Sequence, residues 1–189
     1  MKLKILGLSE NQLFVLLHAS MYGQYCEAVK RLQEGLCAFC DLNGDINRVV
    51  CQNSRWFAWQ NPWPQMHQSH HLVSAHRRHL RHVSELSRKD WSELGGLVKD
   101  LTTANYDIRG GVFAMRFGDM DLSLASENHL HSNIRVPDGK GHVEVTVAWS
   151  PEEARKKVMV ACIFEKMRLG TPFKKLPPKE QKLVEKFVK

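Results

Sequence analysis

The sequence predicts an α+β fold, because segments typical of antiparallel strands alternate along the chain with segments typical of capped helices. The stretch "NRVVCQNSRWFAWQNPWP", residues 47–64, is typical of a strand, a turn at "QNS" and a second strand. The stretch "SPEE" begins at Ser150 and is typical of a helix start, with Pro151 at the first helical position and Glu153 closing a capping box. A hairpin and a separately capped helix in one short chain favour α+β over an all-helical or all-strand protein.

The N-terminal region is predicted to be helical. Ser9 and Gln12 fit a capping box, and apolar residues then recur at helical spacing. This pattern continues weakly to Gln33, with Gly23 as a break, and Gly35 ends it.

More strands and a second helix follow the hairpin. The prolines of "NPWP" require a loop at 61–64, because proline cannot donate to a strand ladder. Ser87, with Asp90 three residues later, predicts a capped helix in the middle of the chain. Alternating polarity and β-branched or aromatic content predict four more strands, "SHHLVSA" (69–75), "GGVFAMRFG" (110–118), "HLHSNIRV" (129–136) and "HVEVTVAW" (142–149).

The C-terminal region is predicted as two helices. The helix that starts at Ser150 is stopped by Gly170 and Pro172, and a short basic helix ends the sequence. We therefore expect a helical extension over residues 1–35, a main domain over 36–170 and a basic helical tail over 171–189.

The composition is typical of a globular protein, and its positive net charge has two interpretations. The chain has 189 residues, 43% hydrophobic and 25% charged, and a net charge of +7. A basic balance favours nucleotides, phosphorylated metabolites, nucleic acid or a membrane surface as partners, but a solvated lysine-rich helix at 174–189 explains much of the excess equally well. The apolar run "LFVLLHAS" is too short for a membrane span and lacks the basic start of a secretory signal, so we expect a cytoplasmic protein without a membrane partner.

Five cysteines include one pair with metal-binding spacing. Cys37 and Cys40 form "CAFC", and thiolates two residues apart can hold a zinc ion from one tight turn. A redox pair is the rival interpretation. A closed zinc site needs two more ligands, which histidine must supply because the chain has no second CxxC. Ten histidines are available, and spacing alone does not choose among them.

The segment "HLHSN" predicts a polar site on a strand. His129, His131 and Asn133 share one face of an extended chain because side chains alternate along a strand. Burying two histidines without partners costs about 1–3 kcal/mol each, and the preceding loop, residues 126–128, is polar as well. The segment is therefore predicted to be a functional site and not part of the apolar core.

These pieces together resemble the histidine triad superfamily over residues 36–150. "HLHSNI" resembles the signature His-x-His-x-His followed by apolar residues, and also the variant with glutamine third in galactose-1-phosphate uridylyltransferases and dinucleoside tetraphosphate phosphorylases. "CAFC", "RWFAWQNPWPQMHQSHHLVSAHRRH" and "GGVFAMRFG" match other family segments in order and spacing. The resemblance implies an antiparallel sheet with helices packed on one face and a homodimer. The sequence adds the helices predicted above at both ends of the chain.

The resemblance also implies a structural zinc site. Its four ligands would be Cys37, Cys40, His79 and His129, with His76 and His82 as rivals for the third ligand. A closed Cys₂His₂ set leaves no position for water or substrate, so zinc would tie the N-terminal loop to the strand that carries the signature.

The catalytic residues implied by the resemblance are His131, Asn133 and Ser126. His131 would attack the α-phosphorus of a nucleotide or dinucleoside polyphosphate and form a covalent nucleotidyl-histidine, as in a nucleotidyltransferase or a nucleotide hydrolase. Ser126 would contact phosphate oxygens. Asn133 departs from the histidine or glutamine of the family and would offer an NH₂ donor on a shorter arm.

Nucleotide-binding residues follow from the same resemblance. Asn61 would take the place of an acidic ribose-binding residue, Trp59 or a neighbouring aromatic residue would stack on the base, and Arg116 would face phosphate or solvent. The alternative function is a zinc-containing module that binds nucleotide or, less favoured, nucleic acid without turnover. A redox protein that uses the cysteine pair is the third alternative.

Overall fold

The computed structural model describes the chain except for residues 1–2, 6, 42–47 and 189. It divides into two compact units, the sheet unit (residues 37–146) and the helical unit (residues 1–36 together with 147–189). The predicted division into segments 1–35, 36–170 and 171–189 stays a prediction. The helical unit groups both ends of the chain with the helix at Pro151–Arg168.

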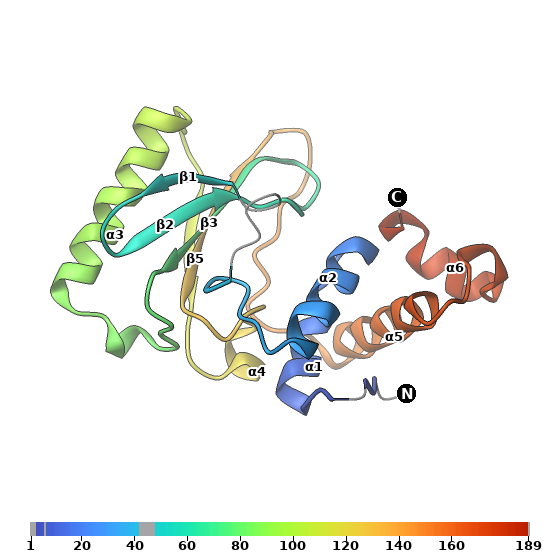
Figure 1. Cartoon of the computed structure of the whole chain (residues 1–189). Coiled ribbons are helices and arrows are strands. Elements are labelled where there is room, and N and C mark those ends of the chain that lie inside the picture. The colour runs from blue at the N-terminus through green and yellow to red at the C-terminus, as the bar shows by residue number, and fades with distance from the viewer. Residues whose placement is uncertain (1–2, 6, 42–47, 189) are drawn as a thin grey trace. The chain divides into compact units, whose positions relative to one another are not determined.

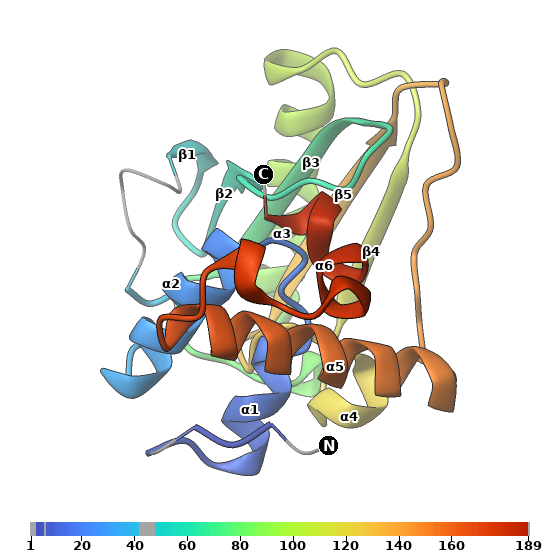
Figure 2. The ribbon, with the colours of Figure 1, turned by 90° about the vertical axis from the view of Figure 1, so that its right-hand side faces the viewer.

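The sheet unit contains a five-stranded antiparallel sheet in the order β1-β2-β3-β5-β4. Figures 1 and 2 show β2, β3 and β5 running side by side at its centre. The strands are β1 (Val49–Gln52), β2 (Trp56–Gln60), β3 (Gln68–His76), β4 (Val112–Arg116) and β5 (His131–Pro137). The α+β prediction is confirmed, as are the hairpin, the proline-containing loop after it and the strands at 69–75, 110–118 and 129–136.

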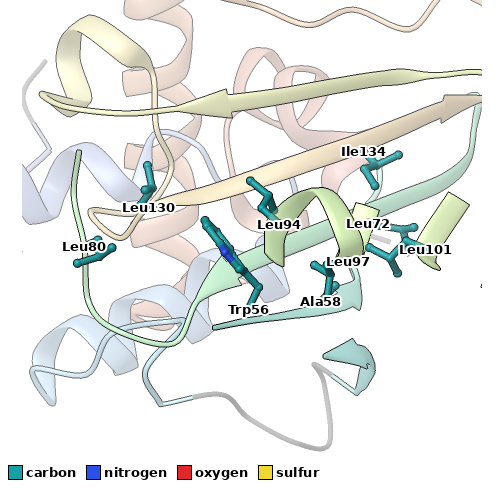
Figure 3. Close-up of a cluster of buried hydrophobic side chains, with 9 residues drawn as sticks. All are labelled: Trp56, Ala58, Leu72, Leu80, Leu94, Leu97, Leu101, Leu130 and Ile134. Atoms are coloured by element: carbon teal, nitrogen blue, oxygen red, sulfur yellow. The ribbon is translucent and has the colours of Figure 1, made fainter. Parts of the chain in front are cut away.

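One face of the sheet is covered by α3 (Arg88–Asp100), which begins where the sequence predicted, with Ser87 as N-cap and Asp90 closing the capping box. Apolar side chains of β2, β3, β5, α3 and the segments adjoining them meet in one buried cluster (Figure 3), namely Trp56, Ala58, Leu72, Leu80, Leu94, Leu97, Leu101, Leu130 and Ile134. The opposite face carries a smaller cluster of Phe57, Trp59, Val73 and Ala75. Polar residues that extend from this second face form the site described below.

The helical unit contains α1 (Glu10–Leu16), α2 (Tyr22–Gln33), α5 (Pro151–Arg168) and α6 (Pro178–Val184). The predicted caps at Ser9 and Ser150 are both present. The break in the N-terminal helix falls at residues 17–21, and Gly23 lies within α2. Figure 2 shows α5 and α6 of this unit. On α5, the Arg168 guanidinium donates to the Glu165 carboxylate at 2.7 Å in a partly buried ion pair.

The remaining elements are short helical segments, and the last two lie within the basic tail that the sequence predicts to be helical. They are Val83–Glu85, Leu101–Asn105, α4 (Met120–Ser123), Phe173–Lys175 and Glu185–Phe187. In the described part of the chain, no helix combines the length and apolar character that crossing a membrane requires.

The predicted strand at 142–149 is wrong. These residues alternate as a strand does, but the structure shows no ladder along them. Their carbonyl groups bind arginine side chains instead: Arg135 donates to Glu144 O at 3.1 Å, and Arg116 donates to Thr146 O. Alternation measures only the tendency to be extended, and a strand also needs a partner edge.

Asp90 joins α3 to the sheet through a buried charged network. Its side chain is fully buried and accepts from His76 Nε2 at 3.0 Å and from the Ser87 hydroxyl at 2.6 Å, with the Arg55 guanidinium 3.2 Å away. The hydrogen bonds from Ser87 and His76 hold the pKa of Asp90 well below its usual range. The carboxylate is therefore ionised and paired in the folded protein.

We predict that Asp90→Asn lowers the free energy of unfolding by about 3 kcal/mol, because it leaves buried partners without their charge. Urea denaturation of Asp90→Asn against wild type measures this. Lys89→Ala, one residue away and largely exposed, is the matched control and should change stability by less than about 0.5 kcal/mol.

The same variant gives a pH prediction. A carboxyl group whose pKa is lowered by folding stabilises the protein above its unfolded pKa of about 3.9 and loses this contribution as the pH falls toward the folded pKa. The difference between wild type and Asp90→Asn should therefore be constant above about pH 5 and shrink below about pH 4. A difference that grows in acid would contradict the role given to Asp90.

Candidate functional site

Four metal-binding side chains from distant parts of the sequence meet at one end of β5. The ligand atoms of Cys37, Cys40, His79 and His129 all lie within 4.8 Å of one another. Cys37 Sγ is 3.4 Å from His129 Nδ1, and Cys40 Sγ is 3.3 Å from His79 Nδ1. The turn before β1, the loop after β3 and the loop before β5 each contribute to this cluster.

The donor set and its spacing fit a zinc ion. A tetrahedral zinc with Zn–S of about 2.3 Å and Zn–N of about 2.0 Å separates sulfur from nitrogen by about 3.5 Å, close to the spacings found here. His129 donates from Nε2 to the carbonyl of His76 at 2.7 Å, so that its Nδ1 lone pair faces the two thiols. Such a hydrogen bond on the outer nitrogen is the usual way in which a protein orients a metal-binding imidazole.

The electrostatics of the cluster also suit a cation. Burial and the neighbouring Cys37 raise the pKa of Cys40 to about 11, because two thiolates repel each other in a partly buried place. A bound dication would reverse this balance and hold both sulfurs as thiolates. Burial lowers the pKa of His129, which keeps its imidazole neutral as a ligand must be.

The two rival histidines lie elsewhere. His76 is buried and binds Asp90, while His82 binds the Ser84 hydroxyl at 2.8 Å. Neither belongs to the group of four.

His131 follows the cluster by two residues and is held in one tautomer. Its Nδ1 donates to the carbonyl of His129 at 2.8 Å, which leaves the lone pair on Nε2. Burial lowers the pKa of His131 to about 4, and the positive charge of Arg116 acts in the same direction. The imidazole is therefore neutral at pH 7, as a nitrogen nucleophile must be.

The His131 ring is also covered. Its side chain lies in a residue that is 3% exposed, and the ring of Phe39 packs against it with centroids 4.9 Å apart. Phe39 belongs to "CAFC", so the metal-binding turn places an aromatic ring on the candidate nucleophile.

Asn133 lies on the same face of β5 and binds a histidine that the sequence did not single out. His71 Nε2 is 2.9 Å from Asn133 Oδ1, and His71 Nδ1 is 2.9 Å from Asn61 Nδ2. Asn61 is thus tied to His71 within the sheet unit. His71 lies on the predicted strand at 69–75, so the sequence could have identified it as a site residue. The many histidines nearby gave no reason to choose it over the others.

Arg116 and Ser126 are placed differently from each other. Arg116 donates to the backbone carbonyls of Ser123 and Thr146, so two of its nitrogens hold loops of the sheet unit. Burial lowers the pKa of its guanidinium. Ser126 is half-buried in the loop between α4 and β5, near the start of the strand that carries His131.

Trp59 is in the core and is 3% exposed. Its ring stacks on Phe57 with centroids 5.5 Å apart, and Phe39 lies 5.2 Å away. Trp59 therefore packs against Phe39, the ring that contacts His131.

Comparison with known proteins gives similarity to solved structures only. No protein-family model and no curated protein matches the sequence. A HIT (histidine triad) family hydrolase from Legionella pneumophila is 20% identical with a TM-score of 0.40, covering 61% of this chain and 98% of the hydrolase. A histidine triad nucleotide-binding protein from Candida albicans is 17% identical with a TM-score of 0.44, covering 70% and 95%.

A zinc-bound histidine triad family protein from Mycobacterium smegmatis is 14% identical with a TM-score of 0.44, and the match covers 71% of this chain and 97% of that protein. All three TM-scores are below 0.5, so these similarities carry no argument here, and we base the proposed function on the chain's own residues.

We predict that the purified protein holds one zinc ion per chain and that Cys37→Ser loses most of it, because a tetrahedral site needs all four ligands. Elemental analysis measures the zinc. Chelation should lower the melting temperature of wild type, since a structural metal stabilises the fold to which it binds. Cys51→Ser, in the same unit but outside the cluster, is the control and should keep its zinc. Wild-type protein that takes up no zinc would contradict this assignment.

Proposed function

We propose that the chain is a histidine triad protein that cleaves a nucleoside phosphoanhydride through a nucleotidyl-His131 intermediate. The mechanism depends on the tautomer of His131. Its Nδ1–H donates to the His129 carbonyl, so the lone pair is on Nε2, on the same face of β5 as the Asn133 amide. The signature residues, the shared face of His131 and Asn133 on β5 and the four-ligand cluster support the family assignment together.

The chemistry requires two displacements. In the first, Nε2 of His131 forms a bond to the α-phosphorus while the anhydride P–O bond breaks, and the leaving phosphate departs with the electron pair. In the second, the oxygen of an acceptor attacks the same phosphorus, loses its proton to solvent, and frees the imidazole. Water as acceptor gives a hydrolase, whereas phosphate or a sugar phosphate gives a transferase.

Zinc has a positioning role in this proposal. Held by the cluster of two thiols and two imidazoles, it would supply a fixed link between the "CAFC" turn and β5. His129 would be a ligand through Nδ1 while its carbonyl orients His131. The metal site and the nucleophile are thus joined by one residue.

A second candidate is a module that binds a nucleotide without turnover. The observation that favours it is the burial of His131, which is 3% exposed. The family resemblance also implies a homodimer, and light scattering of the purified protein would test that part of the proposal.

We predict that mixing the protein with a panel of nucleoside di- and triphosphates and dinucleoside polyphosphates adds the mass of one nucleoside monophosphate to the chain. Intact-protein mass spectrometry measures the gain. His131→Ala should show no adduct, and its turnover should fall by roughly a thousandfold or more, because the nucleophile is lost. Its zinc content should remain that of wild type.

His142→Ala is the matched control, since His142 is exposed and lies outside the site, and its adduct should equal that of wild type. Turnover that survives in His131→Ala would overturn the mechanism. Nucleotide binding without any adduct, surviving in His131→Ala and weakening steeply with salt, would favour the binding module instead.

A further inference from the structure

We infer that a relay of three side chains, Asn61, His71 and Asn133, fixes the Asn133 amide so that its NH₂ group, and not its oxygen, is presented to a phosphoryl oxygen. The identity of the ligand rests on the proposed function. The polarity of the relay does not, because it follows from the hydrogen bonds alone. Asn61 and His71 are positioning residues in this scheme, and Asn133 contacts the substrate.

The relay begins at a backbone group whose polarity is fixed. The amide N–H of Trp63 can only donate, and it lies 2.9 Å from the side-chain oxygen of Asn61. The oxygen of Asn61 is thereby committed as an acceptor. Its nitrogen, Nδ2, must then be the atom that faces His71, 2.9 Å from Nδ1.

The second step sets the tautomer of His71. An amide nitrogen donates, so Nδ1 of His71 must accept and cannot carry a proton. Burial lowers the pKa of His71 to about 4, so the ring is neutral at pH 7 and holds a single N–H, which must be on Nε2. His71 is 4% exposed, and solvent therefore does not compete for either nitrogen.

The third step sets the amide of Asn133. The N–H on His71 Nε2 donates across 2.9 Å, and its acceptor is Asn133 Oδ1. The NH₂ group of Asn133 diverges from this bond, and in the described part of the chain no hydrogen bond engages it. A free NH₂ beside the neutral His131 is a donor for an anionic oxygen.

The opposite orientation would be unfavourable for an anion. An amide rotated by half a turn would present its carbonyl oxygen to the phosphoryl group, and two acceptors repel each other. The relay prevents this because rotation would place NH₂ against the N–H of His71, leaving two buried donors facing each other. A short asparagine side chain can therefore serve as a donor of fixed orientation.

The matching assignment of Asn61 follows. Both of its polar atoms are used inside the protein, one by Trp63 and one by His71. The ribose-binding role that the family resemblance suggested for Asn61 is replaced by a role in orienting Asn133.

The first experiment determines which ring nitrogen of His71 carries the proton. Nitrogen-15 NMR of histidine-labelled protein at pH 7 should show His71 as the neutral tautomer protonated on Nε2. Asn61→Asp, which replaces the donor to Nδ1 by an acceptor, should move a proton onto Nδ1. His70→Gln, on the adjacent strand position and in contact with Tyr106, is the matched control and should leave the His71 signal unchanged. A wild-type ring protonated on Nδ1 would overturn the inference.

The second experiment measures the binding of inorganic pyrophosphate, an anion that tests the Asn133 donor without requiring the correct nucleoside base. Isothermal titration should show binding to wild type and to His70→Gln, and binding weaker by roughly tenfold or more for Asn133→Asp, which still accepts from His71 but offers no donor. Equal binding by Asn133→Asp, or no binding by wild type, would overturn the role of the NH₂ group. Absence of a covalent adduct, with both of these results as expected, would instead remove the proposed catalytic mechanism.

Discussion

The antiparallel pairing of β3 with β5 is the constraint on which the site depends. In this register Ala75 lies opposite His131 and Val73 lies opposite Asn133, so on the β3 side each polar residue has a small or apolar partner. His71, two residues before Val73 on the same face, can then reach the Asn133 oxygen diagonally across the pair. A slip of one residue would turn these side chains to the face covered by α3, where an apolar core excludes them.

Two backbone carbonyl groups orient the imidazole rings of the site. The carbonyl of His76, at the end of β3, orients His129, and the carbonyl of His129 in turn orients His131. Each imidazole therefore has one nitrogen held by the main chain and the other left for a ligand or substrate. The cysteine pair then links this strand to the "CAFC" turn, so metal binding and the direction of the His131 ring depend on the same few atoms.

Aromatic side chains pack around the His131 ring, which is buried. Phe39, Phe57 and Trp59 form an aromatic layer on the site face of the sheet, and Phe39 contacts the imidazole. A buried neutral imidazole is a suitable nucleophile, and in this site the Phe39 ring lies against it. Because Phe39 lies between the two cysteines, a metal held at the turn would also restrict how far this ring can move.

The sequence by itself determined the fold class, the caps at Ser9, Ser87 and Ser150, and the strands whose alternation had a partner, because these features depend on local spacing. The grouping of Cys37 with His129 came from a family resemblance, since no local rule relates residues so far apart. Only the tertiary structure decided that "HVEVTVAW" forms no strand and that His71 and Asn61 direct the Asn133 amide. Both outcomes depend on which groups lie across the sheet, and that information is absent from the spacing along the chain.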